Sequence, residues 1–142
     1  GTRPRTGSRQ RAVQLPRDRR PAHSDMKTEK HLWKHLKTRL KGRGWKRLEA
    51  TTPEGMPDVV GFYRGQTIWI ELKIGKPNVK KLEPGQYDFI CDCLAEGVPV
   101  WVVFAHNGVL KWYPGLPFGE PTTPPAFYVQ KTSAPALRSS DD

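Results

Sequence analysis

Three charged residues interrupt the segment Gly55–Lys76, which otherwise consists of two apolar stretches joined by a short turn. Asp58 stands at the start of the first stretch, and Glu71 and Lys73 stand near the end of the second. Charged side chains are costly in an apolar strand unless a partner or a ligand compensates them. Two carboxylates and a lysine are also the groups that can hold a divalent cation and act on a phosphate ester.

The sequence of the turn predicts where these side chains meet. Arg64-Gly65 has the form of a two-residue hairpin turn, in which glycine supplies the positive φ. That turn sets Asp58 directly opposite Glu71, and opposed residues of an antiparallel pair point to the same face, about 5 Å apart. Lys73 is two residues beyond Glu71 and so shares this face. The register therefore gathers three charges at one end of the hairpin, and a slip of one residue would separate them.

Two interpretations of this cluster remain open from spacing alone. Facing carboxylates repel each other, but a divalent cation held by both reverses that repulsion, with waters and phosphate oxygens completing its coordination. A lysine beside the ion could orient the attacking water or offset charge on the phosphate. This is a minimal apparatus for hydrolysing a phosphodiester. The alternative is a surface hairpin with an ordinary Glu–Lys pair and an aspartate in a loop.

The elements that must position the hairpin follow from periodicity and from breaker residues. A helix is expected over residues 27–40, capped by Ser24 and Asp25 and stopped by glycines at 42 and 44. The elements that follow are, in order, a strand over 45–50, the hairpin, a helix over 83–96, a buried strand over 98–105 and an edge strand over 109–113. The apolar residues expected to face the core are Leu32, Trp33, Leu36 and Leu40 on the first helix and Phe89, Ile90, Cys93 and Leu94 on the second.

This order, α-β-β-β-α-β-β, predicts an α/β fold with one mixed central sheet flanked by helices. The hairpin strands must be antiparallel. The strand after the second helix should run parallel to an earlier strand through a right-handed crossover.

Composition narrows the class of partner. The chain has 142 residues, enough for one domain, and a formal net charge of +10. That charge favours a polyanion, above all nucleic acid, although solubility alone remains an alternative. No apolar run approaches the roughly 18 residues of a membrane span, and the N-terminus lacks the apolar middle of a signal peptide. Cys91 and Cys93 diverge on a helix, which favours an intracellular, disulfide-free protein.

The two ends differ from the middle. Residues 1–25 carry seven arginines against two aspartates, about +5, and are expected to be a disordered basic arm that touches phosphates, or a leader before a start at Met26. Residues 114–142 form a proline-rich extension, expected to lie over the domain or to be disordered past about residue 130.

Pro57-Asp58, followed after a hairpin by Glu71-Leu72-Lys73, resembles the motif of the PD-(D/E)XK nuclease superfamily. The stretches "GMPDVVGFYRGQTIWIELK" and "LEPGQYDFICDCLAEGVPVWVVF" are most similar to the VRR-NUC type over about residues 26–105. The resemblance implies a restriction-endonuclease-like core, with a nuclease domain over residues 26–113.

The resemblance also implies roles for individual residues. Asp58 and Glu71 would be the carboxylates that hold Mg²⁺ or Mn²⁺, and the backbone carbonyl of Leu72 would complete the coordination. Glu29 matches an acidic residue of the first helix that binds metal directly or through water. It lies along the apolar stripe, but a first-turn acid pairing with the helix dipole is an equally good explanation.

Two further matches concern the lysine and the second helix. Lys73 would be the catalytic lysine, and Gln86 matches a glutamine beside the active site. Gln86 is three residues before Phe89 and four before Ile90, so it should point toward the sheet. A boundary glutamine bonding to the backbone remains the alternative.

Lysines near these residues predict a phosphate-binding rim. They follow the second hairpin strand or lie on the polar face of the first helix: Lys76, Lys80, Lys81, Lys30 and Lys34. Such contacts would position DNA without reading its sequence. No base-reading helix is apparent, which disfavours a restriction enzyme.

The leading hypothesis is a metal-dependent DNA endonuclease selective for branched or Holliday-junction DNA, in the cytoplasm of a bacterial or phage-infected cell. Each site would cut one strand, so junction resolution implies a homodimer. The alternatives are a catalytically silent DNA-binding module, and a nuclease of the same fold acting on single-stranded DNA or RNA.

Overall fold

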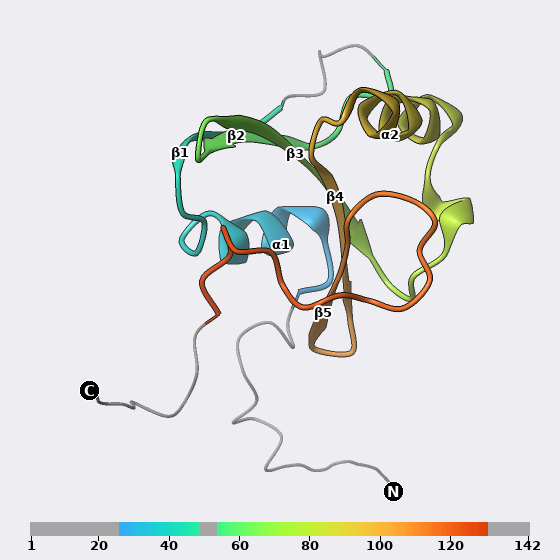
Figure 1. Cartoon of the computed structure of the whole chain (residues 1–142). Coiled ribbons are helices and arrows are strands. Elements are labelled where there is room, and N and C mark those ends of the chain that lie inside the picture. Colours follow the sequence, from blue (N-terminus) through green and yellow to red (C-terminus); the bar gives the residue numbers. More distant parts are fainter. Residues whose placement is uncertain (1–25, 49–53, 131–142) are drawn as a thin grey trace, which may run out of the picture.

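The computed structural model describes residues 26–48 and 54–130, which form a five-stranded sheet with helices packed on it (Figure 1). The elements in chain order are α1 (Glu29–Leu36), β1 (Arg43–Arg47), β2 (Val59–Tyr63), β3 (Gln66–Ile74), the 3₁₀ turn η3 (Val79–Lys81), α2 (Pro84–Glu96), β4 (Val100–His106) and β5 (Val109–Tyr113). The expected fold class is confirmed: an α/β core with the order α-β-β-β-α-β-β.

The sheet is mixed, and its strands lie in the order β1-β2-β3-β4-β5. β3 and β4 are parallel and are connected through α2, whereas the other neighbouring strands are antiparallel. Asn107 and Gly108, with φ of 51° and 75°, turn β4 directly into the edge strand β5. The expected parallel pairing through the second helix and the expected edge strand are therefore both present.

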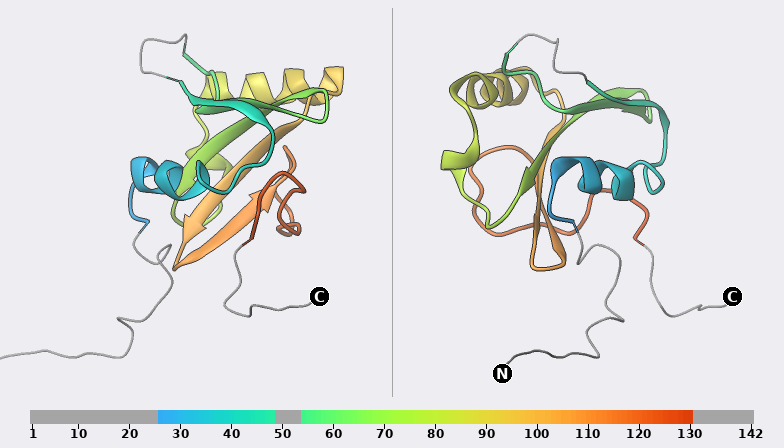
Figure 2. Two further views of the ribbon diagram at one scale, coloured as in Figure 1. Left: turned by 90° about the vertical axis from the view of Figure 1, so that its left-hand side faces the viewer. Right: turned by 180° about the vertical axis from the view of Figure 1, so that it is seen from behind.

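The two helices cover opposite faces of the sheet (Figure 2). On β3, Ile70 and Leu72 lie in the core cluster that contains α1, and Trp69 packs edge-on against Phe89 of α2, with ring centroids 5.1 Å apart. Since side chains alternate along a strand, Glu71 points to the α2 face together with Trp69. The face of β3 that packs against α1 is therefore apolar. The face toward α2 is polar near the C-terminal end of the strand.

Helix α1 is shorter than expected. It begins at Glu29, and the N-cap is Thr28, whose hydroxyl accepts a hydrogen bond from the His31 N–H at 3.1 Å. Ser24 and Asp25, the expected caps, lie outside the described residues. The helix ends at Leu36, and the chain beyond it meets the C-terminal segment, where the Lys41 N–H donates to the Phe127 carbonyl at 2.7 Å.

One other boundary and one orientation also differ from expectation. β1 begins at Arg43 rather than 45, with an irregular register before Lys46. α2 ends as expected at Gly97, which is left-handed with φ of 71°. Leu94, expected to face the core, is 42% exposed, because the helix turns Ile90 and Cys93 toward the sheet instead.

Residues 114–130 return across the sheet and complete its core. Phe127 is only 3% exposed, and its ring lies 5.4 Å from that of Trp45 and 6.0 Å from that of Trp101. Leu40 forms an isolated antiparallel bridge with Tyr128, which joins this segment to the chain after α1. Residues 1–25 and 131–142, for which an arm and a tail are predicted, lie outside the described residues. Within the described ranges, the helices are too short or too polar to cross a membrane.

We expect Phe127→Ala to lower the free energy of unfolding by about 3 kcal/mol, because it removes a buried aromatic ring and leaves a cavity. Urea denaturation measures the change. Val129→Ala, two residues further on and exposed, is the control and should change stability by less than about 0.5 kcal/mol. Equal stability of the two variants would contradict the assignment of residues 114–130 to the core.

Candidate active site

The hairpin register brings Asp58 to the edge of β3. Arg64 and Gly65 have φ of 52° and 76°, the two positive values of a type I′ turn. The pairing runs in step from Tyr63 opposite Gln66 to Val59 opposite Ile70, as the turn sequence predicts. Asp58 is the next residue after this ladder, and its Oδ2 accepts a hydrogen bond from the Leu72 N–H at 2.9 Å.

The proline before Asp58 changes the hydrogen bonding at this edge. Continuing the register sets Leu72 opposite Pro57, which is fully buried and has no N–H to donate. Pro57 therefore cannot donate the backbone hydrogen bond that the Leu72 carbonyl would accept from any other residue at this position. Asp58 takes over the Leu72 N–H, so a carboxylate and a backbone carbonyl lie together at one strand edge.

Glu71 is a buried carboxylate with little compensation. Its side chain is 1% exposed, and neither oxygen has a hydrogen-bond partner among the described residues. Lys73 Nζ forms an ion pair with Glu71 Oε2 at 3.3 Å. Burial, and then the nearby Asp58 charge, raise the pKa of Glu71 to about 9, even though Lys73 opposes the shift. A divalent cation between the two acids would offset both the cost of burying Glu71 and its repulsion by Asp58.

Lys73 is held from the opposite side by Gln86. Lys73 Nζ donates to Gln86 Oε1 at 2.9 Å, and the same oxygen accepts the Glu83 N–H at 3.0 Å. The second bond is half of a capping box that fixes the first turn of α2. Both interpretations of Gln86 are therefore met at once: it bonds to backbone, and it lies beside the candidate site.

Glu29 lies near the site but does not form one metal-binding cluster with Asp58 and Glu71. It is half-buried at the start of α1, and burial followed by the Asp58 charge raises its pKa, whereas Lys73 and Arg47 lower it. Within residues 26–48 and 54–130, no set of three or more His, Cys, Asp and Glu side chains is arranged to hold a metal ion. The residues that could hold a cation at this edge are Asp58 and Glu71, and the Leu72 carbonyl stays a predicted third donor; Mg²⁺ can use such a set with waters and phosphate oxygens.

Arg47 is a neighbour of the site that sequence reasoning missed. It pairs with Val59 at the end of β1, and the next residue, Leu48, donates its N–H to the Asp58 carbonyl at 2.8 Å. Arg47 is half-buried and its charge acts on Glu29. The sequence does not predict this position of Arg47, because the register of β1 is irregular.

The five lysines of the predicted rim are exposed but fall into two groups. Lys76, Lys80 and Lys81 follow the end of β3, where Lys81 Nζ donates to the Ile74 carbonyl at 3.3 Å. Lys30 and Lys34 lie on α1, which covers the other face of the sheet. A rim that joins the two groups stays a prediction.

No protein-family model matches the chain, and a search of curated proteins also finds no match. Among solved structures, the chain is similar to Hjc of Archaeoglobus fulgidus, a Holliday junction resolvase from an archaeal hyperthermophile. The identity is 17%, the match covers 61% of this chain and 72% of that one, and the TM-score is 0.42. A similarity this low shows neither the activity nor the substrate of this chain.

We expect the metal-free protein to lose stability as the pH rises, because the folded-state pKa of Glu71, about 9, exceeds its ordinary 4.5. The stability that this group contributes is fully present below about pH 4.5 and is lost as the pH rises toward 9. Between about pH 5 and about pH 8, the wild type should lose on the order of 2 kcal/mol more than Glu71→Gln, which cannot ionise.

Urea denaturation without divalent cations, at both pH values, measures this difference. Glu96→Gln, which removes an exposed acid at the end of α2, is the control and should follow the wild type. Equal pH slopes for the wild type and Glu71→Gln would contradict the raised pKa.

Proposed function

We propose that the protein is a metal-dependent DNA endonuclease that hydrolyses phosphodiester bonds. One observation carries the proposal: Glu71 is a buried carboxylate without a hydrogen-bond partner among the described residues, the Asp58 charge acts on it, and Lys73 Nζ lies 3.3 Å from its Oε2. A purely structural ion pair between Glu71 and Lys73 does not require Asp58, whose charge raises the free-energy cost of burying Glu71.

Asp58, Glu71 and the Leu72 carbonyl are the residues that would hold Mg²⁺ or Mn²⁺, and Glu29 would approach the ion through a water molecule. What such a cation supplies when bound is activation of a water molecule and polarisation of a phosphoryl oxygen. Glu71 would bind in its ionised form, because a neighbouring dication favours the carboxylate over the acid.

Lys73 would act on the reacting phosphate. Its ammonium is anchored to Gln86 Oε1 at 2.9 Å, so little side-chain freedom remains to be lost when the substrate binds. From this position the ammonium would orient the attacking water or stabilise the negative charge that grows on the phosphate oxygens. Gln86 is a positioning residue in this scheme, since it acts through Lys73.

DNA is the proposed substrate, and branched or junction DNA the proposed preference. The net charge of +10 and the exposed lysines beyond β3 support a polyanion, and the motif resemblance supports DNA with a branch point. Since one site cuts one strand, paired cuts across a junction would need a homodimer.

Cleavage assays with Mn²⁺ test the proposal on four-way-junction, flapped, duplex and single-stranded DNA. Asp58→Ala, Glu71→Gln and Lys73→Ala should each lower the cleavage rate by a factor of about 100 or more, because each removes charge that acts on the transition state. Glu96→Gln is the control for the loss of an acid and should cleave normally. Full activity in any one of the three site variants would refute the assignment.

Calorimetric titration separates an endonuclease from a catalytically silent DNA-binding module. We expect the wild type to bind Mn²⁺ and Asp58→Ala to bind it at least about tenfold more weakly, because one of two carboxylate ligands is lost. DNA affinity without metal should be similar in both, since lysines supply it. DNA binding by the wild type without any binding of Mn²⁺ would favour the module.

A further inference from the structure

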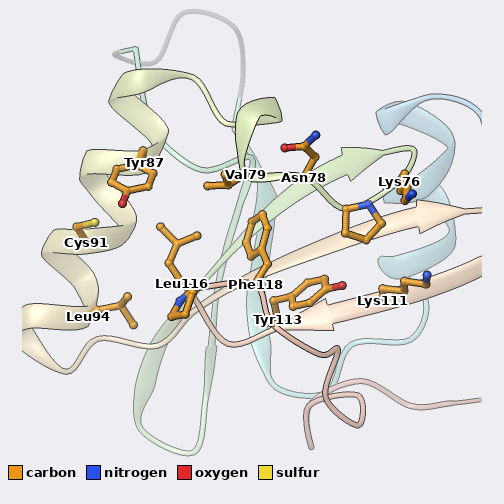
Figure 3. Close-up of a pocket in the computed structure, with 13 residues that line it drawn as sticks. Lys76, Asn78, Val79, Tyr87, Cys91, Leu94, Lys111, Tyr113, Leu116 and Phe118 are labelled. Carbon is orange, nitrogen blue, oxygen red and sulfur yellow. The ribbon is translucent and has the colours of Figure 1, made fainter.

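A pocket of about 850 Å³ lies apart from the carboxylates, between α2, η3, β5 and residues 114–119 (Figure 3). Its floor includes Tyr113, which belongs to the same core cluster as α2, so the pocket opens on the α2 face of the sheet. Asp58, Glu71 and Lys73 do not line it. The nuclease proposal therefore leaves this pocket unused.

The pocket has an apolar and aromatic lining that the described residues leave uncovered. Val79, Tyr87 and Leu94 line it, although they are 44%, 45% and 42% exposed. These three account for half of the six large hydrophobic side chains that are exposed within the described residues. An exposed apolar cluster of this kind indicates a binding site.

The opposite wall is already in place without a ligand. The Phe118 ring lies 5.3 Å from that of Phe104 and 5.0 Å from that of Tyr113, so core contacts hold it. Leu94 packs so closely under Gly115 that a Cβ there would come within 2.7 Å of its side chain. A preformed wall lowers the entropic cost of binding.

Charge defines one end of the pocket. Lys76 and Lys111 lie at the same end, away from Tyr87 and Leu94 (Figure 3). None of the residues that line the pocket is acidic. Burial, and then the charge of Glu120, raise the pKa of Tyr113, but Glu120 does not line the pocket. The complementary ligand has a flat apolar body and an anionic group at one end.

We propose that this pocket binds a nucleotide, with the base against Tyr87 and Phe118 and the phosphate at Lys76 and Lys111. Stacking on an aromatic ring accepts any base, and lysines accept a phosphate as a point charge. The volume of about 850 Å³ lies within the range of small-ligand pockets and is large enough for a nucleotide.

The position of the pocket connects it to the candidate active site. Tyr87 directly follows Gln86 on α2, and Lys76 is three residues beyond Lys73. From Tyr87 to Leu94 the helix rises only about 10 Å, while stacked nucleotides of one strand are about 3.4 Å apart. A nucleotide a few positions from the cleaved phosphate could therefore occupy the pocket. This strand-borne form of the proposal rests on the proposed nuclease function, whereas binding of a free nucleotide does not.

The first experiment titrates the protein with thymidine 5′-monophosphate, thymidine and inorganic phosphate and follows binding by NMR chemical shifts. The monophosphate should bind most tightly. Tyr87→Ala should weaken its binding about tenfold, Tyr87→Phe should retain it, and Lys111→Gln should weaken binding of the monophosphate but not of thymidine. Phe62→Ala, which removes a 52% exposed ring on β2, is the control and should bind like the wild type. Equal affinity of Tyr87→Ala and Phe62→Ala, or no binding to the wild type, would overturn the free-nucleotide site.

The second experiment identifies the source of the nucleotide. If it belongs to the cleaved strand, Tyr87→Ala should raise KM about tenfold on flapped or single-stranded DNA and leave kcat unchanged. Unchanged KM with normal monophosphate binding would assign the pocket to a free nucleotide. Unchanged KM without monophosphate binding would overturn the pocket while leaving the nuclease function intact. Monophosphate binding by a wild type that cleaves no DNA would instead refute the nuclease function and keep the pocket.

Discussion

The hydrogen bond from the Leu72 N–H to Asp58 Oδ2, at 2.9 Å, fixes the end of the central hairpin, and the candidate site depends on it. Pro57 cannot continue the ladder, so β2 stops where β3 runs on, and the aspartate side chain takes the place of a backbone partner. The same bond holds a carboxylate at the edge of β3, next to the face that carries Glu71. The end of the ladder and the placement of the Asp58 carboxylate are therefore one structural event.

Glu71 is only partly compensated in this arrangement. Burial and the adjacent Asp58 charge both oppose its ionised form, and its two oxygens have no hydrogen-bond partner within the described residues. Lys73 compensates only in part, since its ammonium is shared with Gln86. Gln86 in turn completes the capping box of α2, which couples the orientation of the lysine to the start of a helix. A small set of bonds thus joins both hairpin strands to α2.

The C-terminal segment contributes to both faces of the sheet. Phe127 and Tyr128 pack over the aromatic residues on the α1 side, while Phe118 packs on Phe104 and Tyr113 and forms a wall of the pocket. A proline-rich sequence has no periodicity from which such contacts could be foreseen, because each contact depends on where the chain crosses the finished sheet. The sequence therefore does not predict the pocket, although it contains every residue that lines the pocket.

The sequence by itself determined the order of the elements, the parallel crossover and the hairpin register, because local rules govern them: Arg64-Gly65 requires a type I′ turn, and the period of two then sets Asp58 against Glu71. The sequence also indicated that Gln86 faces the sheet. Only the tertiary structure decided the short span of α1, the outward turn of Leu94 and the proximity of Arg47 to Glu29. These features depend on contacts between segments far apart in the chain, and local pattern carries no information about such contacts.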